Sequence, residues 1–362
     1  MKNCIFIAAG GTGGHIYPAL AIAEAFRKER PDWEVLFVGT PHGIENKIVP
    51  AKGFKVLHVQ VGKLNAVSKI EKILTLLRMP FSLLKSWQLL RQYKPKFALG
   101  AGGYASGPVV LVASFLRIPT AIWEPNAVPG FTNRVLSYFV DECMVVFEAA
   151  KNHLHSKRSI FMGMPVRKEI ENVVTRNQSK QPHLLVFGGS QGARAINEVV
   201  AKMLKAADPF AMDHAVVHQT GPKDFARTKE IYGETAGQLS LEIADYLHDM
   251  DRRYAWADIV ISRAGAASVA ELAACGKAAI LIPLPTAADN HQQKNAEVLV
   301  NQNAAIMILQ KDLTPEKLRS TLLQLEANPD ERRQMEANIK KFHHHQAAEK
   351  IVDRILEKIG EA

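Results

Sequence analysis

Short apolar runs alternate with longer amphipathic stretches along the whole chain. Apolar runs at residues 4–8, 35–38 and 97–99 predict buried strands, and helical spacing of apolar residues predicts helices at 18–30 and 109–116. Strands that alternate with helices are typical of βα units, in which neighbouring strands run parallel. The first half of the chain is therefore expected to form an α/β domain around a parallel sheet.

The same arrangement begins again past the midpoint. Further strands are expected at residues 184–187, 259–262, 278–283 and 305–309, and further helices at 193–206, 267–274, 329–344 and 347–359. In each half a glycine-rich turn follows a buried strand, which is the usual start of a Rossmann-like domain. We therefore predict two Rossmann-like domains, at 1–163 and 164–345, with a polar linker at 167–182. A C-terminal helix within 346–362 can pack back on the first domain.

The composition is that of an ordinary folded protein. The chain has 362 residues, of which 47% are hydrophobic and 22% charged, so disordered and fibrous classes are excluded. Its three cysteines, Cys4, Cys143 and Cys275, are far apart, which argues against a disulfide framework or a structural zinc site and fits a reducing cytoplasm. The first apolar run is too short for a signal peptide, and glycines interrupt the uncharged residues 97–116, so no membrane-spanning segment is expected.

The net charge of +9 lies in the first half. Residues 1–163 hold 20 Lys and Arg against 10 Asp and Glu, whereas residues 164–362 hold 25 against 26. Within 63–96, basic residues lie beside apolar residues that recur at helical spacing on both sides of a break expected at Pro80. This pattern is typical of an amphipathic segment at an anionic membrane surface, and nucleic-acid binding would require interleaved aromatic residues instead. The alternative is that the apolar stripe belongs to the core. The residues expected to contact the membrane are Lys69, Lys72, Ile73, Leu77, Phe81, Lys85 and Trp87.

A turn of four glycines, Gly10-Gly11-Thr12-Gly13-Gly14, follows the first strand and precedes His15. Glycines let backbone N–H groups approach an anion, and a helix N-terminus adds partial positive charge. No Lys-Ser/Thr pair follows, so the turn is not a P-loop. The turn serves either tight packing or phosphate binding, and His15 is either a general base or a hydrogen-bonded residue of the helix start.

The second half offers a comparable set of polar groups. The glycine turn at 188–192 brings the Ser190 hydroxyl to a predicted helix start. Arg167 and Arg194 are candidate diphosphate ligands because a guanidinium donates to two oxygens at once, with a solvated surface position as the alternative. Glu271 lies one turn inside the helix after the strand at 259–262, where a carboxylate can accept both hydroxyls of a ribose or simply favour the helix start.

Three further polar motifs carry weaker hypotheses. Residues 289–293, Asp-Asn-His-Gln-Gln, supply amides and an imidazole that suit sugar hydroxyls. Asp249-Met250-Asp251 matches the DxD pattern of metal-dependent sugar transferases, but its position before a predicted helix favours an N-cap. The three histidines at 343–345 lie in a predicted helix, where consecutive side chains point in different directions, so no metal site is predicted.

Together, the motifs resemble those of the bacterial MurG family, whose members add N-acetylglucosamine to the lipid-linked precursor of peptidoglycan. The resemblance covers essentially the whole chain and rests on Gly10–His15 with Pro18, Gly102-Gly103-Tyr104 with Gly107-Pro108, Glu124 and Asn126 before Pro129-Gly130 and Thr132-Asn133, Pro165-Val166-Arg167, Gly188–Arg194 and Arg263–Glu271. It implies the GT-B glycosyltransferase fold, with two parallel sheets facing a cleft, no required cofactor, and inversion at the anomeric carbon to form a β-1,4 bond.

The resemblance also implies substrates and partners. The donor would be UDP-N-acetylglucosamine, and the acceptor would be the C4 hydroxyl of an undecaprenyl-diphosphate-linked N-acetylmuramyl-peptide, which converts lipid I to lipid II. A peripheral position on the cytoplasmic face of the bacterial plasma membrane and contacts with cell-wall synthesis proteins would follow. No nucleic-acid partner is expected.

By the same resemblance, His15 would be the general base and Glu124 a second catalytic residue. The acceptor diphosphate would lie against Gly14, His15, Gly102, Gly103 and Tyr104. The donor would be bound by Thr12, Gly13, Gly14, Asn126, Arg167, Ser190, Leu247, Ala266, Ala267, Ser268, Val269, Ala270, Glu271 and Gln292. Among these, Ser190 would contact the diphosphate, Glu271 the ribose and the backbone near Leu247 the uracil. No metal ligand is implied.

Two positions depart from the family pattern. The family usually has His-Glu-Gln-Asn where this chain has Trp123-Glu124-Pro125-Asn126, and paired glutamines where it has His291-Gln292. Three alternatives therefore stay open at this point. They are a related transferase that glucosylates diacylglycerol, a UDP-sugar epimerase of similar fold, and a non-catalytic protein that binds nucleotides or nucleic acid.

Overall fold

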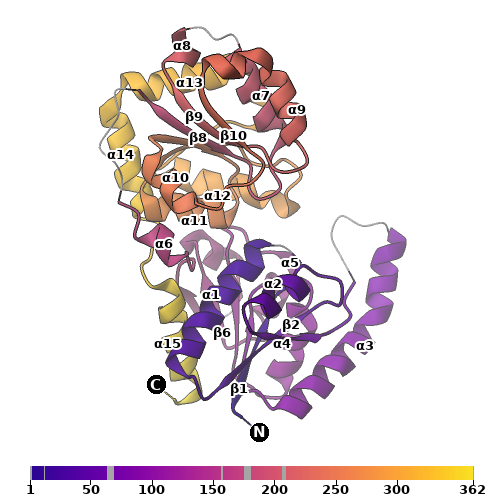
Figure 1. The fold of residues 1–362 in the computed structure, drawn as a ribbon. Helices are drawn as coiled ribbons and strands as arrows, with labels where there is room; N and C mark the ends of the chain where they lie inside the picture. Colours follow the sequence, from indigo (N-terminus) through magenta and orange to yellow (C-terminus); the bar gives the residue numbers. More distant parts are fainter. Residues whose placement is uncertain are drawn as a thin grey trace. The chain divides into compact units, whose positions relative to one another are not determined.

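The computed structural model describes residues 2–11, 13–62, 69–155, 158–174, 181–205 and 209–361. The chain divides into two compact units (Figure 1). The N-terminal unit comprises Met1–Val166 with His344–Ala362, and the C-terminal unit comprises Arg167–His343. The predicted boundaries, 163 and 345, stand three and two residues from these.

The N-terminal unit is built on a sheet of seven parallel strands in the order β3-β2-β1-β4-β5-β6-β7. The strands are β1 (Cys4–Ala8), β2 (Glu34–Gly39), β3 (Lys55–His58), β4 (Phe97–Gly100), β5 (Thr120–Glu124), β6 (Glu142–Val145) and β7 (Ser159–Phe161). Strand β1 pairs with β2 on one side and β4 on the other, and all five of its residues are buried. A strand covered on both faces needs apolar side chains throughout, which explains its unbroken apolar run.

Helices flank this sheet. They are α1 (Gly13–Glu29), α2 (Glu45–Ala51), α3 (Lys69–Tyr93), α4 (Ser106–Phe115), α5 (Phe131–Leu136), the 3₁₀ helix η1 (Glu148–His153) and α15 (Ala347–Ile359). Helix α1 begins five residues before its predicted start, and α3 continues through Pro80 where a break was expected. Pro18 lies inside α1 and Pro80 inside α3, and each removes a single N–H donor without ending its helix.

The last helix, α15, packs beside α1 in the N-terminal unit. Two of its basic side chains reach the buried carboxylate of Glu142, at the start of β6. The Arg354 Nε donates to Glu142 Oε2 at 2.9 Å, and the Lys358 Nζ donates to Glu142 Oε1 at 3.0 Å. This buried ion pair fixes the C-terminal helix to the amino edge of the sheet.

The C-terminal unit has a second, six-stranded parallel sheet in the order β10-β9-β8-β11-β12-β13. The strands are β8 (His183–Phe187), β9 (Ala215–Gln219), β10 (Ser240–Ala244), β11 (Ile259–Ser262), β12 (Ala278–Leu281) and β13 (Ile306–Met307). The helices are α6 (Lys168–Glu171), α7 (Arg194–Lys205), α8 (Pro209–Met212), α9 (Phe225–Tyr232), η2 (Gly233–Gln238), α10 (Met250–Trp256), α11 (Ala266–Cys275), η3 (Ala288–Asn290), α12 (His291–Val300), η4 (Gln310–Asp312), α13 (Pro315–Ala327) and α14 (Pro329–Lys340).

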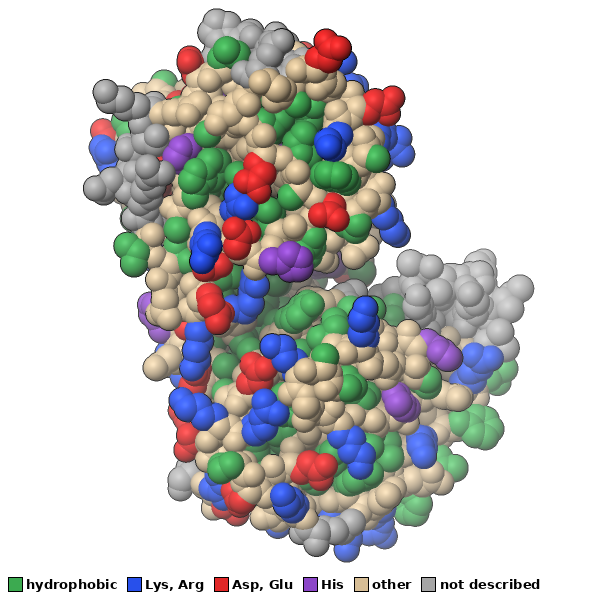
Figure 2. All heavy atoms as spheres, in the orientation of Figure 1, with side chains coloured by type: hydrophobic (Ala, Val, Ile, Leu, Met, Phe, Trp, Pro, Cys, Tyr) green, Lys and Arg blue, Asp and Glu red, His purple; other side chains and the backbone are tan. Residues whose placement is uncertain are grey.

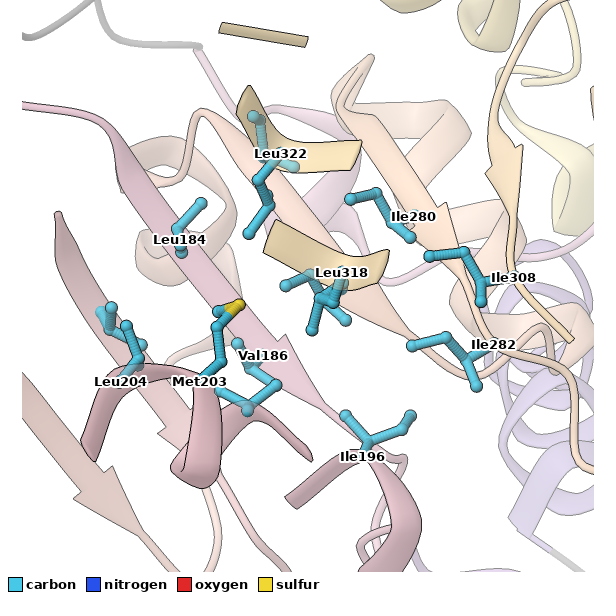
Figure 3. Packing of buried hydrophobic residues seen from close by; sticks show 14 of the residues in the cluster. Leu184, Val186, Ile196, Met203, Leu204, Ile280, Ile282, Ile308, Leu318 and Leu322 are labelled. Atoms are coloured by element: carbon cyan, nitrogen blue, oxygen red, sulfur yellow. The ribbon is translucent and has the colours of Figure 1, made fainter. Parts of the chain in front are cut away.

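The core of this unit lies between the sheet and the helices α7 and α13. Figure 3 shows side chains of β8 and β12 turned toward those of α7 and α13, with Val186, Ile280, Ile196 and Leu318 among them. All four are fully buried. The helical spacing of α7 places its apolar residues on this face, so the predicted amphipathic pattern accounts for the packing.

The prediction of two parallel-sheet α/β domains is confirmed. The three histidines were wrongly expected inside a helix, because α14 ends at Lys340 and α15 begins at Ala347. All three cysteines are buried and free. In the part of the chain that the structure describes, none of the helices combines the length and the apolar character that crossing a bilayer requires.

Candidate functional site

Two glycine loops meet at the carboxyl edge of the N-terminal sheet. The first follows β1 and leads into α1, so His15 lies in the first turn of that helix. The second follows β4, and its Gly102 and Gly103 have φ angles of +100° and +84°. A Cβ on Gly102 would lie 2.4 Å from Nδ1 of His15, and one on Gly103 would lie 2.2 Å from the Gly10 carbonyl oxygen. Only glycine fits at these two positions, and the close approach holds His15 against the second loop.

A buried carboxylate, Glu45, accepts a hydrogen bond from the first glycine loop. It opens α2 and is 0% exposed. The Thr40 N–H and hydroxyl donate to its Oε1 at 2.7 Å and 2.9 Å, and the Gly11 N–H donates to its Oε2 at 3.4 Å. A Cβ on Gly43 would lie 2.0 Å from that carboxylate, so the missing side chain makes room for it. Glu45 thus ties the loop after β2 to the loop that leads to His15.

Glu124, the last residue of β5, organises the loop that follows it. Its Oε1 accepts from the Asn126 N–H and Nδ2 at 2.9 Å and 3.1 Å, and its Oε2 accepts from the Gly130 N–H and the Asn133 Nδ2 at 3.1 Å and 2.9 Å. Burial raises the pKa of Glu124, although these hydrogen bonds act in the opposite direction. The four donors occupy both oxygens, so the geometry supports positioning of Asn126 more than direct proton transfer.

A third glycine turn lies at the carboxyl edge of the C-terminal sheet, between β8 and α7. Gly189 and Gly192 have φ angles of +88° and +74°, and a Cβ on Gly192 would lie 1.8 Å from the Thr220 carbonyl oxygen. Ser190 is exposed at the tip of this turn. The turn leads into the first N–H groups of α7, which have no partner within the helix and are suited to an anion.

Glu271, in α11 of the same unit, is held by two side chains. The Tyr254 hydroxyl donates to Oε2 at 3.0 Å, and the Arg167 Nη2 donates to Oε1 at 3.2 Å. Burial raises the pKa of Glu271 despite Arg167 and Tyr254, which both lower it. Helix α11 begins at Ala266 after Gly265, and no side chain caps it. The capping alternative for Glu271 is therefore not observed.

The remaining predicted donor residues of the C-terminal unit border the same edge. The Leu247 N–H donates to Oε1 of Gln219 at 3.0 Å, and the Leu284 N–H donates to Oε1 of Gln292 at 3.0 Å. Ala266, Ala267 and Ser268 form the first turn of α11, whereas Val269 and Ala270 are buried, and the Val269 N–H donates to the Gly265 carbonyl at 3.0 Å.

Some predictions lie elsewhere than expected or outside the described residues. Asp249 stands at the N-cap position of α10 without a capping hydrogen bond, and its Oδ2 accepts from the Arg253 Nε at 3.0 Å instead. Thr12 lies outside the described residues, as do the side chains of Lys69, Lys72 and Ile73. Tyr104 and Asn126 are half-buried near the two N-terminal loops.

Part of helix α3 exposes apolar side chains, although its Leu89 and Leu90 lie in the core. Leu77, Phe81 and Leu84 are 65%, 73% and 53% exposed, whereas Ser82 and Ser86 are buried against the unit. The Ser82 hydroxyl donates to the Gln60 carbonyl, and the Ser86 hydroxyl donates to the Ser82 carbonyl at 2.8 Å. The predicted alternative, in which the apolar stripe is core, does not describe these three residues.

Comparison with known proteins assigns the chain to a family. Residues 5–145 match the glycosyltransferase family 28 N-terminal domain, and residues 183–351 match its C-terminal domain. A protein of Bdellovibrio bacteriovorus is 50% identical over 99% of both chains, and its description is UDP-N-acetylglucosamine--N-acetylmuramyl-(pentapeptide) pyrophosphoryl-undecaprenol N-acetylglucosamine transferase. This chain belongs to the MurG family of glycosyltransferases.

Other members of the MurG family agree with this assignment. An Anaeromyxobacter protein of the same description is 43% identical over 96% of this chain and 92% of its own. The crystal structure of Acinetobacter baumannii MurG superposes with a TM-score of 0.82 at 29% identity, over 99% of this chain and 100% of that one. The predicted family and GT-B fold are thereby confirmed.

Within each unit, the structure gathers the residues that the sequence predicted. In the N-terminal unit, His15, Gly102 and Gly103 meet. In the C-terminal unit, Arg167 and Glu271 are bonded to each other. Sequence reasoning missed Glu45, Gln219 and Tyr254. An isolated Glu, Gln or Tyr has no spacing signal of its own, and only the sheet order reveals what it contacts.

Proposed function

We propose that this protein transfers N-acetylglucosamine from UDP-N-acetylglucosamine to the C4 hydroxyl of undecaprenyl-diphosphate-linked N-acetylmuramyl-peptide, with inversion, in peptidoglycan synthesis. The observation that carries this proposal is the 50% identity, over 99% of both chains, to a protein described as that transferase. The glycine loops and polar side chains at the carboxyl edges of both sheets supply the chemistry that such a reaction needs.

The C-terminal unit binds the donor in this proposal. Ser190 and the first N–H groups of α7 contact the diphosphate, Glu271 accepts from the ribose hydroxyls, and the backbone at Leu247 contacts the uracil. When the sugar departs, negative charge grows on the diphosphate. A helix N-terminus and the Arg167 guanidinium stabilise that charge without reorganising, which lowers the barrier. Gln292 binds the sugar hydroxyls.

The N-terminal unit binds the acceptor in this proposal. His15 removes the proton from the attacking hydroxyl, because a histidine titrates near neutral pH and general-base catalysis is most effective there. The two glycine loops, which meet at His15, donate backbone N–H groups to the acceptor diphosphate. Glu45 and Glu124 hold these loops and Asn126 in place, so we assign Glu124 a positioning role.

The same unit rests on the cytoplasmic face of the membrane in this proposal. Leu77, Phe81 and Leu84 are exposed on α3, with Lys85 and Trp87 beside them. Lysine and arginine side chains are also spread over the N-terminal unit on the face shown in Figure 2. Apolar side chains enter the interface while each basic residue near an anionic leaflet adds roughly 1 kcal/mol.

The test crosses two donors with two acceptors. Purified protein is given UDP-N-acetylglucosamine or UDP-glucose, each with lipid-linked muramyl-peptide, with diacylglycerol or with no acceptor, and released UDP is measured. We expect turnover only with UDP-N-acetylglucosamine and the muramyl lipid. Turnover only with UDP-glucose and diacylglycerol would support the glucosyltransferase alternative. UDP release without any acceptor would support hydrolase chemistry, whereas conversion of the donor to an epimeric UDP-sugar without UDP release would support the epimerase alternative. Salt-sensitive nucleic-acid binding without turnover would support a binding protein.

A further inference from the structure

Gln219 lies at the carboxyl edge of the C-terminal sheet, on the strand next to the edge strand β10. It is the last residue of β9, which lies between β8 and β10. In register it is opposite Phe187 on one side and Ala244 on the other, the last residues of those two strands. Its side chain is buried, with 4% exposed. It is therefore placed to reach the loops that follow both neighbouring strands.

The amide of Gln219 bonds to both loops at once. Its Oε1 accepts from the Leu247 N–H at 3.0 Å, in the loop after β10. Its Nε2 donates to the Gly189 carbonyl oxygen at 3.1 Å, in the glycine turn after β8. One end must accept and the other must donate, and an amide does both whereas an ionised carboxylate only accepts. A buried partner left without its bond carries a larger penalty than an exposed one.

Further hydrogen bonds connect the loops of the same region. The Thr220 N–H donates to the Ala244 carbonyl at 2.9 Å, and the Asn197 Nδ2 donates to the Thr220 carbonyl at 2.8 Å. The Gly192 backbone approaches that carbonyl too closely for any side chain. The loops after β8, β9 and β10 are therefore packed against one another, and the Gln219 side chain connects the first of them to the last.

We propose that Gln219 is a positioning residue that sets the spacing between the Leu247 peptide and the glycine turn at 188–192, and so selects a uridine ligand that carries a diphosphate. The inference rests on the proposed function, in which Leu247 contacts the uracil and Ser190 the diphosphate. These contacts lie at the two ends of the nucleotide. Affinity is higher when their spacing is already set before the ligand binds, because less ordering has to occur on binding.

The test compares uridine and UDP as competitors for a fluorescent UDP analogue. In Gln219→Glu an ionised carboxylate faces the Gly189 carbonyl, and in Gln219→Met both hydrogen bonds are lost. We expect the Kd for UDP to rise about tenfold in both variants, since about 1.4 kcal/mol corresponds to a factor of ten. The Kd for uridine changes less, so the ratio of the uridine Kd to the UDP Kd falls. The donor KM rises while the acceptor KM stays unchanged.

Asn338→Asp is the matched control. Asn338 is a buried amide of α14 whose Nδ2 donates to the Asn303 carbonyl at 3.3 Å, just before β13 and so at the amino edge of the same sheet. This variant shifts the thermal midpoint without changing the ratio of the two Kd values. Thermal midpoints of all variants separate general destabilisation from the specific effect, because a purely structural role would weaken uridine and UDP equally.

The two levels of the hypothesis fail in different ways. If wild-type protein binds UDP and the folded Gln219 variants keep its ratio of uridine to UDP affinity, the positioning role is overturned while the proposed function stands. If wild-type protein does not bind UDP, the proposed function fails and the positioning role with it.

Discussion

Replacement of Glu271 by alanine is expected to weaken both nucleotide binding and stability, for different physical reasons. The substitution leaves the Tyr254 hydroxyl, which is fully buried, without its acceptor, and this costs about 1–3 kcal/mol of unfolding free energy. The Arg167 side chain is 54% exposed, so loss of that ion pair costs less than about 1 kcal/mol. Loss of a charged acceptor for the ribose weakens UDP binding by about 1–3 kcal/mol, or roughly 5- to 150-fold in Kd.

Two matched variants separate these effects. Glu271→Gln keeps an acceptor for Tyr254 but loses the charge, so it should weaken UDP binding with a smaller loss of stability. Tyr254→Phe removes the hydroxyl together with its need for a partner, so the Kd for UDP should stay within about threefold of wild type. Calorimetric titration with UDP and thermal unfolding measure both quantities. A folded Glu271→Ala protein that binds UDP as tightly as wild type would refute the ribose role.

Four further outcomes are expected. His15→Ala should lower kcat by about 100- to 10,000-fold and leave the Kd for UDP unchanged, and wild-type turnover would remove His15 from the mechanism. Glu45→Gln turns an amide N–H toward the Thr40 donors, so kcat per folded molecule should fall at least severalfold, whereas equal turnover would show that the loop does not need this carboxylate. The double variant Phe81→Ser, Leu84→Ser should reduce binding to anionic vesicles in a flotation assay, since burial of a Phe or Leu contributes about 1.5–3 kcal/mol each. The control is Leu323→Ser on the exposed face of α13, which should leave vesicle binding unchanged. Burial raises the pKa of Glu142, but hydrogen bonds and charge from Arg354 and Lys358 outweigh it and hold the pKa below its usual value. The ionised Glu142 therefore stabilises the fold above about pH 4.3, and this contribution is lost as the pH falls through the lowered pKa. Glu142→Gln should flatten this part of the curve of thermal midpoint against pH.

The regular elements could be predicted where one physical signal dominated. Strands β1 and β11 and helix α15 have the predicted bounds, because they have an unbroken apolar run or a strongly one-sided apolar face. Six strands were missed: β3, β5, β6, β7, β9 and β10. The edge strands β3, β7 and β10 are mostly half-exposed or exposed, so their sequences lack the apolar signal. Strands β5, β6 and β9 are buried, but polar residues such as Thr120, Glu142 and His218 shorten or interrupt their apolar runs.

The candidate site was predictable only in part for a similar reason. Glycine turns after strands are visible in the sequence because their spacing has a conformational cause, and they led to His15 and Ser190. The partners that hold these turns, such as Glu45 and Gln219, depend on which strands are neighbours. That order, β3-β2-β1-β4 in one sheet and β10-β9-β8-β11 in the other, cannot be read from local spacing.

A crystal structure with bound UDP-N-acetylglucosamine tests most directly whether the C-terminal unit binds the donor at the carboxyl edge of its sheet. We expect density for the uracil at the Leu247 backbone, for the ribose hydroxyls within hydrogen-bond distance of Glu271, and for the diphosphate at Ser190. A nucleotide bound away from Glu271 would contradict the proposed donor site and the roles assigned to the residues around it.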